Sequence, residues 1–159
     1  MLSLSHTTGY AINALRCLSE PNCDNRSTPD IARCAGIPRP YLAKLINSLA
    51  RHGLVTARRG VGGGVSLARS ADEITLLQIV VAVEGEHWLG ECLLGLDECS
   101  DALTCPTHPF WLRIRGEITE ELARTTLAAV NRARNPISGW KCWRHDTRPA
   151  ESKRTSGHK

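Results

Sequence analysis

Residues 27–69, STPDIARCAGIPRPYLAKLINSLARHGLVTARRGVGGGVSLAR, decide the fold of this chain. The stretch begins with a helix signal: Thr28 can cap, Pro29 suits the first helical position, and Asp30 favours a helix N-terminus. Gly36 then ends this helix after about two turns. We therefore predict a short helix at the start of the stretch, followed by a tight glycine turn.

A second helix follows the turn at once. Its apolar side chains recur at the spacing i, i+3, i+4, i+7, which places them on one face; they are Leu42, Leu45, Ile46 and Leu49. Pro38 and Pro40 are tolerated only in a first turn, and Gly53 stops the helix. Because the outer face is basic, two short helices joined by a glycine turn predict a helix-turn-helix.

A glycine-rich bend follows the second helix. Two strand-like pieces, LVTAR and GVSLA, flank it and predict a β-hairpin, or wing. The bend joins two strands instead of opening a helix and lacks a Gly-Lys-Ser/Thr ending, which disfavours a nucleotide-binding loop. The expected fold class is mostly α with a small β-wing: a winged helix-turn-helix followed by a long dimerisation helix. Residues 1–84 are the expected DNA-binding domain.

Charge is unevenly distributed along the 159 residues. The net charge is +4, yet residues 1–70 hold nine Lys or Arg against three Asp or Glu, and residues 71–140 hold five against eleven. The basic first half is the expected nucleic-acid surface. The longest apolar run, ITLLQIVVAV, is too short to span a bilayer, and the first residues lack a targeting pattern. We expect a cytoplasmic protein without membrane association.

Residues 106–134 are expected to form one long amphipathic helix. Its apolar stripe follows alternating steps of three and four residues through Trp111, Ile114, Ile118, Leu122, Thr125 and Ala129. Pairing with the same helix of a second copy would bury this stripe, which predicts a homodimer; packing back onto its own domain is the alternative. Residues 71–85 predict a buried helix, and the basic tail, residues 135–159, is expected to be disordered.

Three cysteines and one histidine cluster between the two predicted helices. Cys92, Cys99, Cys105 and His108 supply four soft or borderline ligands, enough for a closed tetrahedral shell. Residues 85–108 are therefore the expected cluster-binding loop. Cys105 and His108 stand three residues apart at the expected helix start, where they would share a face. Two further cysteines lie in apolar helical patterns and are expected in the core; they are Cys17 and Cys34.

The ligand spacing leaves several chemistries open. These ligands include no Cys-x2–4-Cys pair of the zinc-knuckle type, and gaps of six and five residues suit a larger object such as an iron–sulfur cluster. The alternative is a winged-helix DNA-binding regulator that is stabilised by zinc or that switches through cluster-free thiols. A chance grouping of these residues without any function is the last and least favoured alternative. An enzyme is not expected, because Cys-x-x-Cys and a thioredoxin-like βαβ pattern are absent from the sequence.

With these parts in place, the chain resembles the iron–sulfur winged-helix regulators of the Rrf-two (Rrf2) family, typified by IscR, NsrR and RirA. The resemblance covers residues 1–134 and is carried by LSHTTGYAINAL, IPRPYLAKLINSLARHGLVTARRGVGGGVSLAR and CLLGLDECSDALTCPTHPFW. It implies a homodimeric transcription factor, expected here to be a repressor, that binds a palindromic or pseudo-palindromic operator in double-stranded DNA. It also implies a bound iron–sulfur cluster that senses iron or iron–sulfur status, nitric oxide or redox stress.

The resemblance carries over to individual residues. The three cluster cysteines fall on Cys92, Cys99 and Cys105, and His108 takes the place of the histidine that completes a 2Fe–2S site in IscR-like members. The acidic ligand of 4Fe–4S members falls on Gly9, which cannot ligate, so a 2Fe–2S cluster is favoured over 4Fe–4S. Expected DNA contacts come from the second helix and the wing: Arg39, Tyr41, Lys44, Asn47, Arg58 and Arg59.

Overall fold

The computed structural model describes residues 4–19, 26–60, 62–90, 92–95 and 105–133. The chain is mostly helical with one two-stranded antiparallel sheet, so the predicted fold class is confirmed. The elements follow in the order α1 (His6–Ser19), α2 (Thr28–Ala35), α3 (Arg39–Arg51), β1 (Val55–Arg58), β2 (Gly64–Leu67), α4 (Leu76–Glu84), α5 (His108–Arg124) and α6 (Leu127–Arg132).

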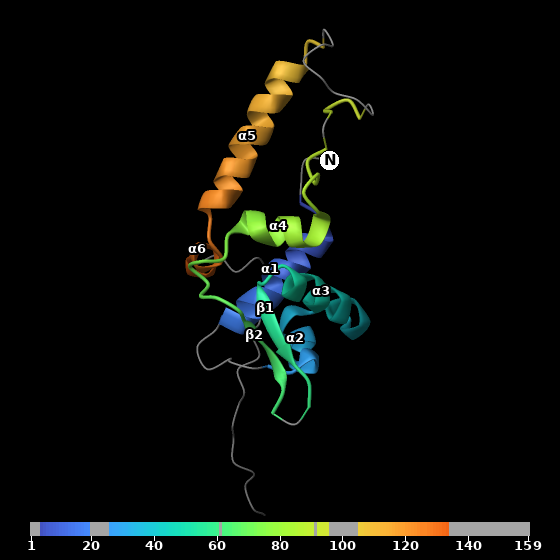
Figure 1. Ribbon diagram of the computed structural model, residues 1–159, viewed down its shortest axis with the longest axis vertical. Helices are drawn as coiled ribbons and strands as arrows, with labels where there is room; N and C mark the ends of the chain where they lie inside the picture. The colour runs from blue at the N-terminus through green and yellow to red at the C-terminus, as the bar shows by residue number, and fades with distance from the viewer. Residues whose placement is uncertain (1–3, 20–25, 61, 91, 96–104, 134–159) are drawn as a thin grey trace, which may run out of the picture.

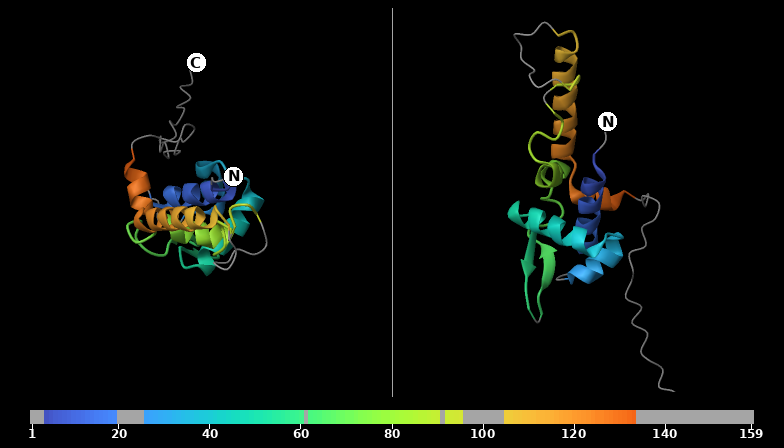
Figure 2. Two further views of the ribbon diagram at one scale, coloured as in Figure 1. Left: turned by 90° about the horizontal axis from the view of Figure 1, so that it is seen from above. Right: turned by 90° about the vertical axis from the view of Figure 1, so that its right-hand side faces the viewer.

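The elements form a helical body from which two pieces project. Helices α1, α2 and α3 make the body, α4 lies across it, and α6 returns to its side (Figure 1). The β1–β2 hairpin and α5 point toward opposite ends of the molecule (Figure 2). Within the described residues, no helix is both long enough and apolar enough to cross a bilayer.

The helix-turn-helix forms where the sequence predicts it. Gly36 ends α2 in the left-handed conformation, with φ of 65°, which a side chain would disfavour. The cap prediction is wrong by one residue: Ser27, not Thr28, is the N-cap, and its Oγ accepts a hydrogen bond from the Asp30 N–H at 3.3 Å. Ser27 and Thr28 both carry a hydroxyl group and both precede Pro29, so the sequence alone does not determine which of them is the N-cap.

The core lies where α1, α2, α3 and α4 meet. The predicted apolar stripe of α3 is buried, and Leu42 and Leu49 are fully enclosed. Cys17 of α1 and Cys34 of α2 are also buried, as predicted from their apolar surroundings. The structure adds a disulfide between these two cysteines, which no sequence pattern indicated.

The wing is a short hairpin with a tight glycine turn. Val55 pairs with Leu67 at its base and Arg58 pairs with Gly64 at its tip. The Gly63 N–H donates to the Gly60 carbonyl at 3.0 Å and closes the turn. A side chain on Gly63 would place its Cβ 2.4 Å from the Arg58 carbonyl oxygen, which leaves no room for any residue but glycine.

The expected single helix over residues 106–134 is wrong. Helix α5 begins at His108 and ends at Arg124, and Thr125 is extended, with φ of −81° and ψ of 118°. Thr126 then starts α6 as its N-cap, and its Oγ1 accepts from the Ala129 N–H at 3.2 Å. The spacing of the stripe residues does not reveal this break, because the stripe continues across it.

A backbone pairing explains the break between α5 and α6. The Leu76 N–H donates to the Thr125 carbonyl at 2.9 Å, and the Leu127 N–H donates to the Ile74 carbonyl at 2.8 Å. These bonds need an extended chain, and β-branched threonines adopt it readily. The partner residues lie about fifty positions earlier, so a local reading of the sequence does not detect the pairing.

Helix α6 packs back onto the domain. For this part of the expected long helix, the structure therefore agrees with the alternative prediction, which was packing onto the chain's own domain. Leu127 is fully buried in the core. The Asn131 side-chain amide donates to Ser19 Oγ at 2.7 Å and fixes α6 against the end of α1. Helix α6 thus buries Leu127 and Ala128 in the chain's own core, whereas the predicted stripe residue Ala129 is half-buried.

Replacing Gly63 with alanine is expected to lower the free energy of unfolding by about 1–3 kcal/mol, because backbone atoms must move to admit the Cβ. Urea unfolding followed by circular dichroism measures the change. Gly9→Ala is the matched control: Gly9 lies within α1, where an added Cβ meets nothing within 4 Å. That change should be neutral or stabilise by about 0.5–1 kcal/mol. Equal stability of Gly63→Ala and the parent would contradict the described turn.

Candidate DNA interface and metal site

The outer face of α3 presents the residues predicted to contact DNA. Arg39, Tyr41, Lys44 and Asn47 are all exposed, because the buried stripe holds the opposite face against the core. Since each residue turns a helix by about 100°, Arg39 and Tyr41 lie at opposite edges of this face, and Lys44 and Asn47 lie between them. The helix therefore offers one cation and one amide centrally, with Arg39 at its border.

Tyr41 is held by α1. Its hydroxyl shares a hydrogen bond with the Thr7 hydroxyl, and its ring meets the ring of Tyr10 edge-on with centroids 5.7 Å apart. The residue keeps 37% of its surface exposed. Its phenol is thus occupied inside the protein, and the exposed ring edge is the part available to a partner.

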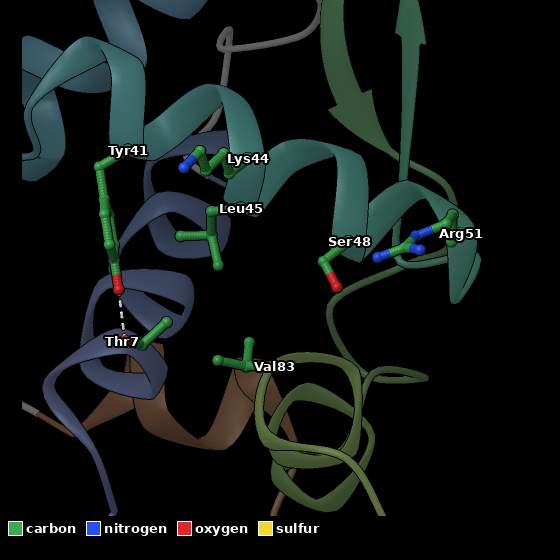
Figure 3. Close-up of a pocket in the computed structure, with 7 residues that line it drawn as sticks. All are labelled: Thr7, Tyr41, Lys44, Leu45, Ser48, Arg51 and Val83. Carbon is green, nitrogen blue, oxygen red and sulfur yellow. Dashed lines mark hydrogen bonds between the residues drawn. The ribbon is translucent and has the colours of Figure 1, made fainter.

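A groove of about 270 Å³ runs beside this face, between α3, α1 and α4 (Figure 3). Its lining is mixed, with two cations from α3 and no carboxylate: Thr7, Tyr41, Lys44, Leu45, Ser48, Arg51 and Val83. Ser48 Oγ donates to the Ala82 carbonyl at 2.6 Å and joins α3 to the floor of the groove. The groove widens the basic surface of α3 toward its C-terminal end.

Arg51 is the residue that the sequence analysis did not single out. It lies on the same side of α3 as Lys44, seven residues later, and lines the same groove. Its spacing from Lys44 was the available signal. Arg51 lies in the last turn of α3, where a cation also stabilises the helix dipole, so the sequence pattern does not distinguish this structural role from a role in binding.

The cations of α3 and the wing have no internal carboxylate partner. Arg58 ends β1 and Arg59 follows it in the turn, and both are exposed. In the part of the chain that the structure describes, none of the following makes an ion pair: Arg39, Lys44, Arg51, Arg58 and Arg59. Arg33 of α2, in contrast, pairs with Asp30. Unpaired surface cations on two neighbouring elements make a surface suited to phosphate.

The predicted metal ligands flank a segment outside the described residues. Cys92 lies in the turn after α4, where its carbonyl accepts from the Gly95 N–H at 3.2 Å. Cys105 and His108 lie at the start of α5, and Cys99 falls outside the described residues. Cys92 and Cys105 are not disulfide-bonded, and both are half-buried.

The Cys105 thiol is tuned toward its thiolate form. The Thr107 hydroxyl lies 3.2 Å from Cys105 Sγ and is the largest cause that lowers the pKa of this thiol. The backbone N–H groups of Thr107 and His108 lower the pKa further, against a smaller opposing effect of burial. Since the thiolate is both the metal ligand and the nucleophile, this environment suits metal binding and thiol chemistry alike.

The surroundings of His108 contain an unmet hydrogen-bond donor. Trp111 stands one turn after His108, is 2% exposed, and its Nε1–H finds no acceptor among the described residues. A buried indole N–H without a partner is costly, and a sulfur acceptor in this loop would relieve it. The described residues alone contain no group of three or more His, Cys, Asp or Glu side chains that could hold a metal. Their donors nonetheless fit a soft-metal site that also requires Cys99.

An apolar surface borders the same region. Four large hydrophobic side chains of the loop and of the start of α5 are exposed: Leu93, Leu94, Phe110 and Leu112. Farther along α5, Ile114, Ile118 and Leu122 are only half-buried. Uncovered apolar surface of this extent on a projecting helix is typical of an interaction site.

Helix-turn-helix, wing and unpaired basic face together define a winged-helix DNA-binding protein. The profile of the Rrf2 family, described as an iron-dependent transcriptional regulator, matches residues 4–133. Protein aau3 of Rhizobium meliloti (strain 1021) is 30% identical over 138 residues, covering 86% of this chain and 90% of the relative. The regulator IscR of Pectobacterium carotovorum (strain PC1) is 36% identical over 98 residues, covering 62% of this chain and 59% of the relative.

Solved structures agree with these sequence matches. CymR (YrzC), the global cysteine regulator of B. subtilis, aligns with a TM-score of 0.66 at 27% identity, covering 82% of this chain and 97% of CymR. IscR of T. potens aligns with a TM-score of 0.63 at 29% identity, covering 81% of this chain and 85% of IscR. The chain belongs to the Rrf2 family of transcriptional regulators. The expectation that it is not an enzyme is confirmed by these regulators.

Proposed function

We propose that the chain is a homodimeric repressor that binds a palindromic or pseudo-palindromic operator and reports on iron, iron–sulfur supply, nitric oxide or redox stress through an iron–sulfur cluster. The observation that carries the DNA-binding part is the row of unpaired cations on α3 and the wing. The observation that supports the sensing part is the pair of half-buried cysteines, Cys92 and Cys105, which lie in one loop and are not disulfide-bonded.

For DNA, α3 enters the major groove with Lys44 and Asn47 toward the base edges and Arg39 at its border. Tyr41 contributes its ring edge, because its hydroxyl is engaged by Thr7. Arg58 and Arg59 hold the wing on the phosphate backbone or in the minor groove. Arg51 extends the phosphate contacts along the groove beside α3.

For assembly, α5 pairs with the α5 of a second copy. This pairing would cover the half-buried stripe of the helix and the apolar side chains at its start, which a monomer leaves in contact with water. Two copies related by a twofold axis present two α3 helices, which matches a palindromic site. The proposed DNA-binding domain spans residues 1–84, the cluster loop 85–108, and the dimerisation helix is α5 instead of the whole of 106–134.

For sensing, Cys92, Cys99, Cys105 and His108 would hold the cluster, with 2Fe–2S favoured. By the family resemblance, Gly9 takes the place of the acidic ligand of 4Fe–4S members and has no side chain to ligate, which favours His108 over the nearby His6 as the fourth ligand. The lowered pKa of Cys105 and the unmet Trp111 donor support a sulfur-rich site here. When bound, such a cluster supplies one-electron redox chemistry and reactivity toward nitric oxide and oxygen.

The residue just before the loop connects to α3 through hydrogen bonds to α1. Glu84 ends α4 and accepts from the Thr8 hydroxyl and, at 3.1 Å, from the Ser5 N–H. Burial raises the pKa of this carboxyl, but the bonds from Thr8 and Ser5 outweigh it and leave the pKa lowered. The neighbouring Thr7 contacts Tyr41 of α3. A change of loop geometry would thus reach the DNA-contacting helix through the first turn of α1.

A second candidate is a cluster-free thiol switch. The absence of a disulfide at Cys92 and Cys105 and the lowered pKa of Cys105 favour it equally well. The similarity to a global cysteine regulator points in the same direction. A structural zinc site is the third reading of the same ligands. Metal content separates the three.

Removing a DNA-contacting cation is expected to weaken operator binding and flatten its salt dependence. Arg51→Ala and Arg58→Ala should each reduce the magnitude of the slope of log affinity against log salt by about 1, because one phosphate contact is lost. Fluorescence anisotropy with an operator enriched from a random DNA pool measures it. Arg33→Ala is the control, since Arg33 already pairs with Asp30. Unchanged slopes in both test variants would contradict this interface.

Anaerobically purified protein is expected to be brown to red and to contain iron and acid-labile sulfide. Cys92→Ala, Cys99→Ala, Cys105→Ala and His108→Ala should each lose most of the visible absorption, and Cys23→Ala should retain it, because Cys23 lies in a separate segment before α2. A colourless protein with one zinc per chain would support the zinc site. A metal-free protein after reconstitution with iron and sulfide would support the thiol switch and exclude the cluster.

A further inference from the structure

The described cysteines fall into two chemical classes. Cys92 and Cys105 lie in the loop after α4, are half-buried and form no disulfide. Cys17 and Cys34 are 2% and 7% exposed, lie in the core of the DNA-binding domain, and are bonded to each other. The proposed sensing function uses only the first class, so the bonded pair requires its own explanation.

Neighbouring helices bring the bonded pair together. Cys17 lies in the last turn of α1 and Cys34 in the last turn of α2, 17 residues apart in sequence, and their Cα atoms are 6.4 Å apart. This separation lies within the range that a disulfide spans without backbone movement. The apolar side chains on both sides hold this distance: Ala14, Leu18, Ile31 and Ala35. The site is therefore preformed by packing instead of depending on a mobile loop.

We propose that Cys17 and Cys34 form a reversible thiol–disulfide site in the DNA-binding domain, independent of the loop cysteines and oxidised by low-molecular-weight disulfides such as glutathione disulfide. The Cys34 thiolate, the more exposed of the two at 7%, attacks the disulfide when the α1–α2 contact opens locally, forms a mixed disulfide and releases one glutathione thiolate. The second cysteine thiolate then displaces the other glutathione and closes the Cys17–Cys34 bond. Two protein thiols are oxidised, one glutathione disulfide is reduced to two glutathione molecules, and the charges balance.

The bond staples α2 to the helix that supports it. Helix α2 leads through Gly36 into α3, so a fixed α1–α2 contact also fixes the start of the DNA-contacting helix. In the reduced state each thiol still packs as a small apolar group, so the helices need not move. Oxidation is therefore expected to raise the stability of the domain against unfolding and to leave its DNA sequence preference unchanged. This proposal does not depend on the iron–sulfur cluster.

Disulfide formation is tested on the full chain in the Cys92→Ala background, which disables the loop site. The protein is equilibrated with glutathione disulfide, unfolded in N-ethylmaleimide, digested and analysed by mass spectrometry. The expected product is one linked species joining the Cys17 and Cys34 peptides, and dithiothreitol should convert it to two alkylated peptides. Recovery of both peptides alkylated after oxidation, or linkage of Cys17 to another cysteine, would overturn the proposal.

The consequence is tested by thermal unfolding of the oxidised and reduced forms. The oxidised form should have a Tm higher by about 5–10 °C, as expected for a disulfide that closes a loop of this length. Cys17→Ala and Cys34→Ala should each abolish the redox dependence of Tm, and Cys23→Ala should retain it. An equal Tm in both redox states, or a redox-dependent Tm that persists in the Cys17→Ala variant, would overturn the staple.

Discussion

The burial of one face of α3 is the constraint on which the rest of the structure depends. Leu42, Leu45, Ile46 and Leu49 are enclosed by the core, and together they remove from water a side-chain surface that stabilises the domain by several kcal/mol. Because these four residues hold one face of α3 against the core, Lys44 and Asn47 on the opposite face point outward. The same packing sets the groove beside α3, since α1 and α4 cover the buried face and form its walls.

The fold follows from local signals up to the point where distant residues intervene. The glycine turn at Gly36, the α3 stripe and the strand pieces of the wing are all encoded within a few residues, so they were predictable. The break at Thr125 was not, because it depends on backbone bonds to Ile74 and Leu76, far back in the chain. The Cys17–Cys34 bond escaped prediction for the same reason: burial of each cysteine was visible in the pattern, but their contact was not.

The candidate site divides in the same way. The excess of cations in the first half of the chain indicated a DNA surface, and six predicted contacts lie exposed on α3 or the wing. The sequence did not indicate that the Tyr41 hydroxyl forms a hydrogen bond with the Thr7 hydroxyl or that Arg51 lines the same groove as Lys44. In the loop, residue types and spacing predict the ligands, and the structure contributes the hydroxyl beside Cys105 and the buried donor of Trp111. Cys99 lies outside the described residues, so its place in the site remains the sequence prediction.

Two basic DNA-contacting elements and a cysteine loop are joined here by one short link, the first turn of α1, which contacts Glu84 before the loop and Tyr41 on α3. The central claim is that the state of the loop alters the grip on DNA through this link. Its most direct test is the operator affinity of the cluster-loaded and cluster-free protein at one salt concentration. The account predicts a difference of about tenfold or more between them, in affinity or between operator sequences. Equal affinities and equal sequence preference in the two states would contradict it.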